Sequence, residues 1–338
     1  MNRAGASMTP LLELRGISKR FSSRLDLASR IAARLGAGAR EQTVHALDGV
    51  NLSIDAGEVV GLVGESGCGK STLGRIVARI LEPSEGERRW KGRPYAEYES
   101  PASRPERLAI QMVFQDPFAS LNPRLRIADV IGEAPVVHGL VPASERDAYV
   151  AEIMQRVGLD ASLARRFPHQ FSGGQRSRIG IARALAVKPT FLVCDEAVAA
   201  LDVSIQAQVL NLFIRLREEF GLTYLFISHD LGVVRHLSDR VVIMYLGRVV
   251  ESAPSDEVFA RPNHPYTRAL LAEIPRLEAT KRVYIPIKGE IPSPLNPPRG
   301  CHFHPRCPHS TPRCQAEAPS LREIAPGHAS ACHLNDTP

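Results

Sequence analysis

The sequence lacks several features that mark membrane-spanning, secreted or nucleic-acid-binding proteins. It contains no run of 18 or more consecutive apolar residues, so no membrane span is predicted. Residues 1–6 lead into no long apolar segment, so a signal peptide is not expected. The net charge is +6, but basic and acidic residues interleave and form no concentrated basic footprint. No nucleic-acid partner is therefore expected.

What remains is the composition of a globular protein. The chain has 338 residues, enough for one large domain and an appendage, and hydrophobic residues make up 44% of it. A modest positive charge suits a protein that works near an anionic membrane surface.

A glycine-rich loop lies between an apolar run, residues 59–63, and a segment whose apolar residues recur at helical spacing, residues 73–81. A strand, a glycine-rich turn and a helix N-terminus together form an anion site, because backbone N–H groups converge there. The loop fits the phosphate-loop pattern G-x-x-x-x-G-K-[ST]. Lys70 is expected to reach the β- and γ-phosphates of a nucleotide, and the Ser71 hydroxyl to bind Mg²⁺. The predicted phosphate loop comprises Gly64, Glu65, Ser66, Gly67, Cys68, Gly69, Lys70, Ser71 and Thr72.

The thiol of Cys68 lies within this loop. Its position near a helix N-terminus and Lys70 is expected to favour a reactive thiolate.

Two adjacent carboxylates follow a second apolar run, residues 190–194. They are placed at the C-terminal edge of a predicted parallel strand, where α/β proteins bind ligands. Asp195 suits Mg²⁺ coordination, directly or through water. Glu196 is free to polarise an attacking water as a general base.

A third element opens a helix with the residues Ser172, Gly173, Gly174 and Gln175. Backbone N–H groups and one hydroxyl at this helix start predict a second anion site. One chain with a phosphate loop and a separate anion-binding helix start indicates a nucleotide held between two subunits.

These motifs, in this order, resemble the nucleotide-binding subunit of an ABC transporter. The resemblance implies an α/β fold of the P-loop NTPase type, with a RecA-like core, an antiparallel β subdomain and a helical subdomain. It also implies roles for four further residues. Gln115 matches the Q-loop glutamine, which senses the γ-phosphate beside Mg²⁺, and Asp202 matches the D-loop. His229 matches the switch histidine at the γ-phosphate, and Phe21 stands where an aromatic ring usually stacks on adenine.

Residues 114–123, 201–210 and 264–271 are similar to segments of oligopeptide and dipeptide importers, and the chain looks like the second of their two ATPase subunits. The resemblance implies a non-identical ATPase partner, two membrane permease subunits and, indirectly, an extracytoplasmic substrate-binding protein. It places the chain at the cytoplasmic face of the inner membrane, as a peripheral subunit that powers import of peptides or a related solute. The alternative is a soluble ABC ATPase that acts on ribosomes or DNA.

The expected organisation is a nucleotide-binding domain over residues 9–262, with a helical subdomain near 101–185, and an extension over residues 263–338. Residues 9–20 and 43–54 are predicted to be strands, and residues 240–251 a hairpin with its turn at Gly247. Residues 22–41 interrupt the first two strands. They form either a basic amphipathic helix that touches lipid or permease, or a surface insertion. Prolines beyond about residue 285 exclude long helices.

Four of the six cysteines lie in this extension: Cys301, Cys307, Cys314 and Cys332. Disulfides are not expected in a cytosolic ATPase, and a proline-rich tail with little core of its own suggests a metal site. Some members of the importer branch carry a [4Fe–4S] cluster on a matching set, so the resemblance implies such a cluster on these four residues. The alternatives are free thiols and zinc, although the gaps between these cysteines are longer than zinc sites usually show.

Overall fold

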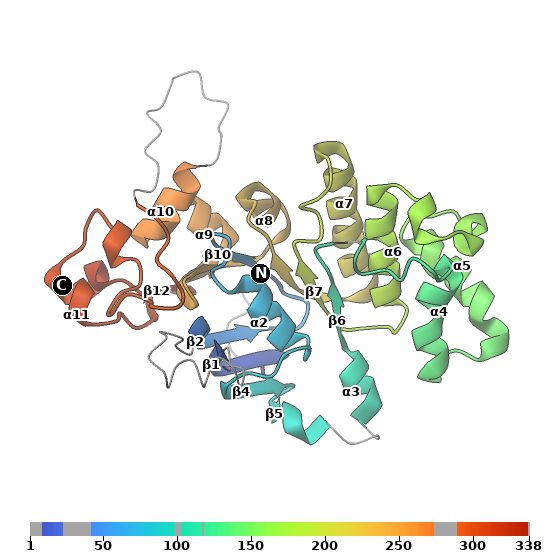
Figure 1. The fold of residues 1–338 in the computed structure, drawn as a ribbon, viewed down its shortest axis with the longest axis horizontal. Helices are drawn as coiled ribbons and strands as arrows, with labels where there is room; N and C mark the ends of the chain where they lie inside the picture. The colour runs from blue at the N-terminus through green and yellow to red at the C-terminus, as the bar shows by residue number, and fades with distance from the viewer. Residues whose placement is uncertain (1–8, 23–41, 99–102, 117, 274–288, 337–338) are drawn as a thin grey trace, which may run out of the picture.

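A computed structural model describes residues 9–22, 42–98, 103–116, 118–273 and 289–336. The insertion that the sequence predicts within residues 22–41 lies almost entirely outside this part of the chain. The described residues form two sheets with helices around them (Figure 1).

The larger sheet has eight strands in the order β11-β12-β10-β9-β3-β8-β7-β6. Its centre is parallel: β3 pairs with β8 and β9, and β7 pairs with β8 and β6. Every residue of β3, β7 and β8 is buried, as expected for parallel strands covered on both faces. The strands are β3 Val59–Val63, β6 Ile110–Val113, β7 Phe191–Asp195, β8 Thr223–Ile227, β9 Arg240–Tyr245, β10 Arg248–Pro254, β11 Arg322–Ala325 and β12 His328–Ser330.

The smaller sheet is antiparallel, in the order β2-β1-β4-β5. The strand predicted over residues 43–54 is confirmed at both ends, and the strand predicted over residues 9–20 is confirmed with its start three residues later and its end two residues later. A fully buried Trp90 on β4 packs edge-on against Phe191 of the central sheet, with 6.1 Å between ring centroids, and so joins the two sheets. The strands are β1 Leu12–Ser22, β2 Thr43–Ile54, β4 Glu85–Trp90 and β5 Arg93–Pro94.

Helices α4, α5 and α6 pack against one another, and α6 contacts the edge strand β6, at the opposite end of the molecule from the C-terminus (Figure 1). This is where the sequence predicts a helical subdomain, although β6 itself belongs to the central sheet. The α-helices are α2 Lys70–Val77, α3 Arg104–Leu108, α4 Ile127–Val137, α5 Arg146–Arg156, α6 Gly173–Leu185, α7 Val203–Phe220, α8 Leu231–Leu237, α9 Ser255–Ala260, α10 Pro265–Ala272 and α11 Pro312–Ala316. Short 3₁₀ turns lie at Tyr95–Tyr98, Ala143–Glu145, Ala161–Arg165, Pro168–Gln170, His304–Arg306 and His333–Asp336.

The hairpin predicted over residues 240–251 is confirmed as β9 and β10. Gly247 in its turn has φ +81°, a conformation that glycine adopts without strain. The extension then continues the same sheet, because β12 pairs with β10 and β11 pairs with β12. The sequence did not predict these two strands, but its exclusion of long helices is confirmed for the described part of the extension.

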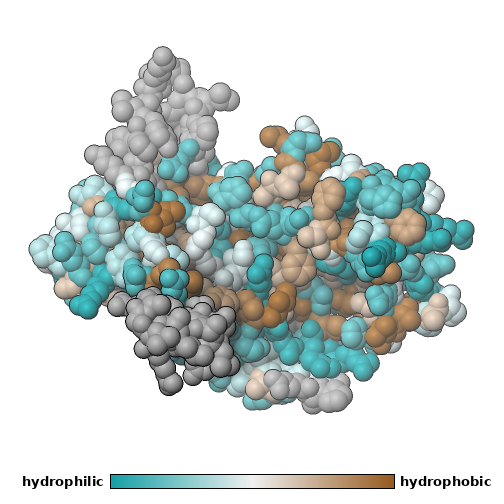
Figure 2. Space-filling view, in the orientation of Figure 1, coloured by the Kyte–Doolittle hydropathy of each residue, from teal (hydrophilic) through white to brown (hydrophobic). Residues whose placement is uncertain are grey.

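None of the helices in the described ranges is long and apolar enough to cross a bilayer. On the face drawn in Figure 2, hydrophobic residues occur in small groups among hydrophilic ones.

Candidate nucleotide site

The predicted phosphate loop lies between β3 and α2, and its backbone is tightly packed. A Cβ atom at Gly69, where φ is +105°, would lie 2.4 Å from the carbonyl oxygen of Ala46. One at Gly64 would lie 2.2 Å from the carbonyl oxygen of Met244. Both contacts are far below van der Waals distance, so the loop requires glycine at these positions.

The ammonium group of Lys70 is held inside this loop. Lys70 is only 5% exposed, and its Nζ donates hydrogen bonds to the carbonyl oxygens of Gly64, at 2.7 Å, and Glu65, at 3.0 Å. A lysine fixed in this way carries its positive charge over the loop, where phosphate oxygens are expected.

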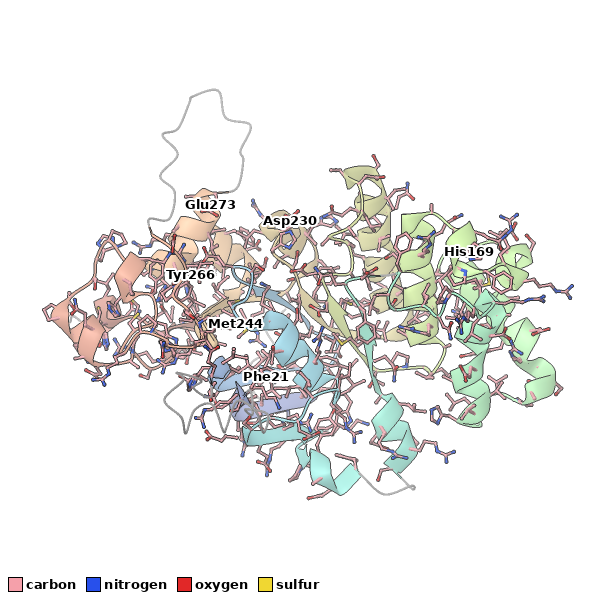
Figure 3. The ribbon with its side chains drawn as sticks, viewed as in Figure 1. Phe21, His169, Asp230, Met244, Tyr266 and Glu273 are labelled. Carbon is pink, nitrogen blue, oxygen red and sulfur yellow. The ribbon has the colours of Figure 1, made fainter. Side chains whose placement is uncertain are left out.

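A cavity of about 350 Å³ opens beside the loop and brings several predicted residues together. The aromatic ring of Phe21 lies at its edge and is 41% exposed, so one face is accessible for stacking. Figure 3 labels Phe21 at the end of β1. Three loop residues, Gly64, Glu65 and Cys68, are not among those that line the cavity. The lining residues are Phe21, Val44, Ala46, Ser66, Gly67, Gly69, Lys70, Ser71, Thr72, Gln115, Glu196 and Pro294.

Asp195 does not line the cavity itself, but it contacts Ser71, which does. Asp195 is 3% exposed, and the Ser71 hydroxyl donates a 2.8 Å hydrogen bond to its Oδ1 atom. Burial raises the pKa of Asp195 above its ordinary value, while the hydrogen bond from Ser71 lowers it. A carboxylate and a hydroxyl on adjacent elements, with the amide of Gln115 on the same cavity, are oxygen ligands of the kind that Mg²⁺ prefers.

Glu196 connects the two other residues predicted to act on the γ-phosphate. Its carboxylate accepts a hydrogen bond of 2.6 Å from Gln115 Nε2 and lies 3.3 Å from His229 Nδ1. The three side chains come from the C-terminal ends of adjacent parallel strands: β6, β7 and β8. Glu196 has φ +47°, a strained conformation for a residue with a side chain, costing about 1–3 kcal/mol. Such strain is typical of functional sites.

The helix start that the sequence predicts to be a second anion site lies outside the residues that line this cavity. Ser172 caps α6: its hydroxyl accepts from Gln175 N at 3.3 Å, and Gln175 Oε1 accepts from Ser172 N at 3.0 Å. Asp202 likewise caps α7 by accepting from Ile205 N. Neither residues 172–175 nor Asp202 are among the residues that line the cavity beside the phosphate loop of their own chain.

The expectation of a reactive thiolate at Cys68 is wrong. Cys68 is only 4% exposed, and this burial raises the pKa of its thiol, outweighing the opposing effect of Lys70. The residue instead supports the loop through its backbone, since its carbonyl oxygen accepts a 2.9 Å hydrogen bond from Gly247 N.

The predicted iron–sulfur cluster is contradicted as well. Within the described residues, which include all four cysteines of the extension, no group of three or more Cys, His, Asp or Glu side chains is placed to hold a metal ion. Burial raises the pKa of Cys301 to about 11 and also raises the pKa of Cys307 and Cys332, which favours neutral thiols. All four are free cysteines in the structure.

A proline-rich extension with little core of its own would need a metal to hold it together. This extension instead shares a buried apolar cluster with strands β9 and β10. Phe303 is 2% exposed, with its ring centroid 5.2 Å from that of Tyr245 and 5.4 Å from that of Tyr266. Cys301 and Cys307 pack against the same apolar cluster.

Pro294 is a cavity residue that the sequence did not reveal. Its carbonyl oxygen accepts a 2.9 Å hydrogen bond from His45 N, which holds the extension against β2 beside the nucleotide cavity. No motif marks this proline, because a hydrogen bond between segments about 250 residues apart in the chain brings it to the cavity.

A larger cavity of about 690 Å³, lined by residues such as Leu140, Tyr149 and Phe220, contains none of the predicted site residues.

This arrangement, with a phosphate loop, a buried Asp195 bonded to Ser71 of that loop and Glu196 on the same cavity, defines a nucleotide-hydrolysing P-loop ATPase. The "ABC transporter" family matches residues 47–199, and the "Oligopeptide/dipeptide transporter, C-terminal region" matches residues 250–314. The chain belongs to the ABC transporter family, and to its oligopeptide/dipeptide branch.

Two ATP-binding proteins of oligopeptide and dipeptide transport match almost the whole chain. The oligopeptide transport ATP-binding protein AppF of Bacillus subtilis (strain 168) is 50% identical over 333 residues, which cover 97% of this chain and 98% of that protein. The dipeptide transport ATP-binding protein DppF of Haemophilus influenzae (strain ATCC 51907 / DSM 11121 / KW20 / Rd) is 46% identical and covers 96% of each chain.

Solved structures confirm the predicted fold class. The dimeric post-hydrolysis state of the ATP-binding cassette MJ0796, bound to ADP and Pi, superimposes with a TM-score of 0.61 at 28% identity and covers 72% of this chain and 98% of that one. CbiO1 of Clostridium perfringens, part of the transporter complex cbiONQ, gives a TM-score of 0.60 at 29% identity, covering 75% and 92%.

Proposed function

We propose that this chain binds and hydrolyses ATP to power the import of peptides through membrane permease subunits. One observation carries the proposal: Glu196 lines the same cavity as the phosphate loop, and its carboxylate accepts a hydrogen bond from Gln115 and lies beside His229. A general base in this place accepts a proton from the water that attacks the γ-phosphate. The family membership of the extension, and the names of its relatives, support peptides as the substrate class.

Each part of the site has a chemical task. Backbone N–H groups of the phosphate loop and the ammonium of Lys70 bind the phosphates, and Phe21 stacks on the base. Ser71, Asp195 and Gln115 would hold Mg²⁺, which neutralises phosphate charge when bound. Gln115 and His229 orient Glu196 and would contact the γ-phosphate of a bound nucleotide.

The site is completed by a second cassette. The capped helix start at residues 172–175 and Asp202 lie outside the cavity of their own chain, which supports a role at a partner's nucleotide. The solved relative that is bound to ADP and Pi is dimeric, which favours the same arrangement. We propose a non-identical ATPase partner, two permease subunits, an extracytoplasmic substrate-binding protein, and a peripheral location on the cytoplasmic face of the inner membrane.

Affinity purification from membranes tests the transport assignment. The tagged chain is expected to co-purify permease subunits and a second ATPase, and the complex is expected to hydrolyse ATP faster when a peptide-loaded binding protein is added. An untagged strain is the control. Recovery of the chain with ribosomes or DNA, and without membrane subunits, would instead support the soluble alternative.

Mixed complexes test the shared site. Ser172→Arg places a bulky cation at the start of α6, so it is expected to block hydrolysis at the partner's phosphate loop more than at this chain's own. Combining it with a partner that lacks its phosphate-loop lysine separates the two sites. Full hydrolysis by the isolated chain, first order in its concentration, would refute the two-cassette mechanism.

A further inference from the structure

A residue of the C-terminal extension forms a salt bridge with the phosphate loop. Arg306 lies in the 3₁₀ turn His304–Arg306, and its guanidinium donates to both carboxylate oxygens of Glu65, at 2.6 and 2.9 Å. The Arg306 side chain is only 4% exposed and that of Glu65 is 20% exposed. A bidentate pair so shielded from water is geometrically specific and far less screened by salt than a surface pair.

A second residue from the same part of the chain holds the backbone of Glu65. The N–H of Glu65 donates a 2.9 Å hydrogen bond to the hydroxyl of Tyr266 in α10. Tyr266 is fully buried, and its ring packs against Tyr245 and Phe303. Figure 3 labels Tyr266 on the extension side of the phosphate-loop helix α2. This anchor is therefore part of the rigid core that the extension shares.

The third polar group of Glu65, its backbone carbonyl, contacts the lysine of the phosphate loop. Its carbonyl oxygen accepts from Lys70 Nζ at 3.0 Å. All three polar groups of Glu65 are thus used: the carboxylate by Arg306, the N–H by Tyr266, and the carbonyl by Lys70. Glu65 also places a carboxylate within a loop that must receive a polyanion, and the guanidinium of Arg306 offsets that charge.

We propose that Arg306 and Tyr266 are positioning residues for nucleotide binding, which fix and neutralise the first turn of the phosphate loop through Glu65. The inference rests on the proposed ATP-binding function. The C-terminal extension thereby contributes to nucleotide binding. Without Arg306 the carboxylate of Glu65 would lack this partner, and Lys70, which donates to the carbonyl of Glu65, would be less constrained.

A double-mutant cycle read as MgATP affinity tests this proposal. Arg306→Gln is expected to weaken MgATP binding about tenfold, or about 1.4 kcal/mol. Adding Glu65→Gln to that variant removes the unpaired charge and is expected to recover most of the loss, which a purely structural defect would not do. Arg313→Gln is the matched control, since Arg313 is an arginine of the same extension paired at the surface with Glu317, and it is expected to bind MgATP like the wild type.

Tyr266→Phe keeps the buried ring and removes only the hydroxyl, so it decides the question if Arg306→Gln does not fold. We expect it to raise the KM for ATP about threefold or more with little change in kcat. Wild-type affinity in both Arg306→Gln and Tyr266→Phe would overturn the proposal, as would a loss in Arg306→Gln that Glu65→Gln leaves unchanged. Failure of the wild-type protein to bind MgATP would instead refute the proposed function.

Discussion

Gln115 Nε2 lies 2.6 Å from Glu196 Oε2, so the side chain that follows the edge strand β6 is bonded directly to the proposed base at the end of β7. The other oxygen of Glu196 faces His229, which follows β8. The parallel order β6-β7-β8 places these three strand ends side by side. Two residues that are distant in sequence, Gln115 and His229, therefore both contact the carboxylate of Glu196.

Replacing this carboxylate by an amide separates binding from hydrolysis. In Glu196→Gln the loop and Lys70 remain, so ATP affinity should stay within about threefold of the wild type, while turnover falls by about 100-fold or more. Nucleotide titration and phosphate release measure the two quantities. Glu133→Gln, an exposed change on α4, is the control. Near-normal turnover in Glu196→Gln would remove Glu196 from its role.

The aromatic ring at the cavity edge should contribute to nucleotide affinity. Phe21→Ala is expected to weaken ATP binding about fivefold or more, because stacking of a base on an aromatic ring is worth about 1–3 kcal/mol. Phe21→Tyr preserves the ring and should bind ATP like the wild type. Phe220 is 42% exposed, close to the 41% of Phe21, but lies at the end of α7, so Phe220→Ala is a matched control. Equal affinities for Phe21→Ala and Phe220→Ala would contradict stacking.

A buried carboxylate joins the extension to the core. Glu251 is 0% exposed and accepts hydrogen bonds from His328 Nε2 and from the backbone N–H groups of Asn263 and His264, each at 2.8 Å. Glu251→Ala leaves these donors unsatisfied and should lower the free energy of unfolding by about 3 kcal/mol or more. Urea unfolding measures the loss.

Glu257→Ala is the control for this change, since Glu257 pairs with Arg261 at the surface. It is expected to leave the unfolding midpoint unchanged. Similar midpoints for Glu251→Ala and Glu257→Ala would show that the buried network does not stabilise the extension.

The stability of the protein should depend on His264 in mildly acidic solution. Burial lowers the pKa of His264 from 6.5 to about 4. The unfolded chain therefore binds a proton that the folded protein does not between these values, so the free energy of unfolding falls as pH falls from 6.5 toward 4. The slope from this group is at most about 1.4 kcal/mol per pH unit, and it vanishes above pH 6.5.

His264→Asn isolates this contribution, because asparagine also caps a helix N-terminus and does not titrate. The variant should lose less stability than the wild type between pH 6.5 and 4, as followed by unfolding at a series of pH values. His309→Asn, an exposed change in the extension, is the control. Parallel pH profiles for the wild type and His264→Asn would contradict the lowered pKa.

The sequence alone determined the parts of this protein whose chemistry is local. A phosphate loop requires glycines, a lysine and a hydroxyl at fixed spacing, and a carboxylate pair after a buried strand must emerge at the ligand-binding edge of a parallel sheet. Two strands of the small sheet and the hairpin at Gly247 were predictable for the same reason, because the alternation of apolar and polar residues and the turn residues occur within short segments of sequence.

Tertiary structure decided the features that depend on distant segments. The thiol of Cys68 was expected to be reactive because of its neighbours in sequence, but burial beneath the hairpin turn governs its pKa. The cysteines of the extension suggested a metal because their segment lacks a core, and the shared packing around Phe303 supplies one. The pairing of Arg306 with Glu65 spans 241 residues and leaves no local pattern, because the packing of Phe303 on Tyr245 and Tyr266, together with the pairing of β12 with β10, holds the extension beside the phosphate loop.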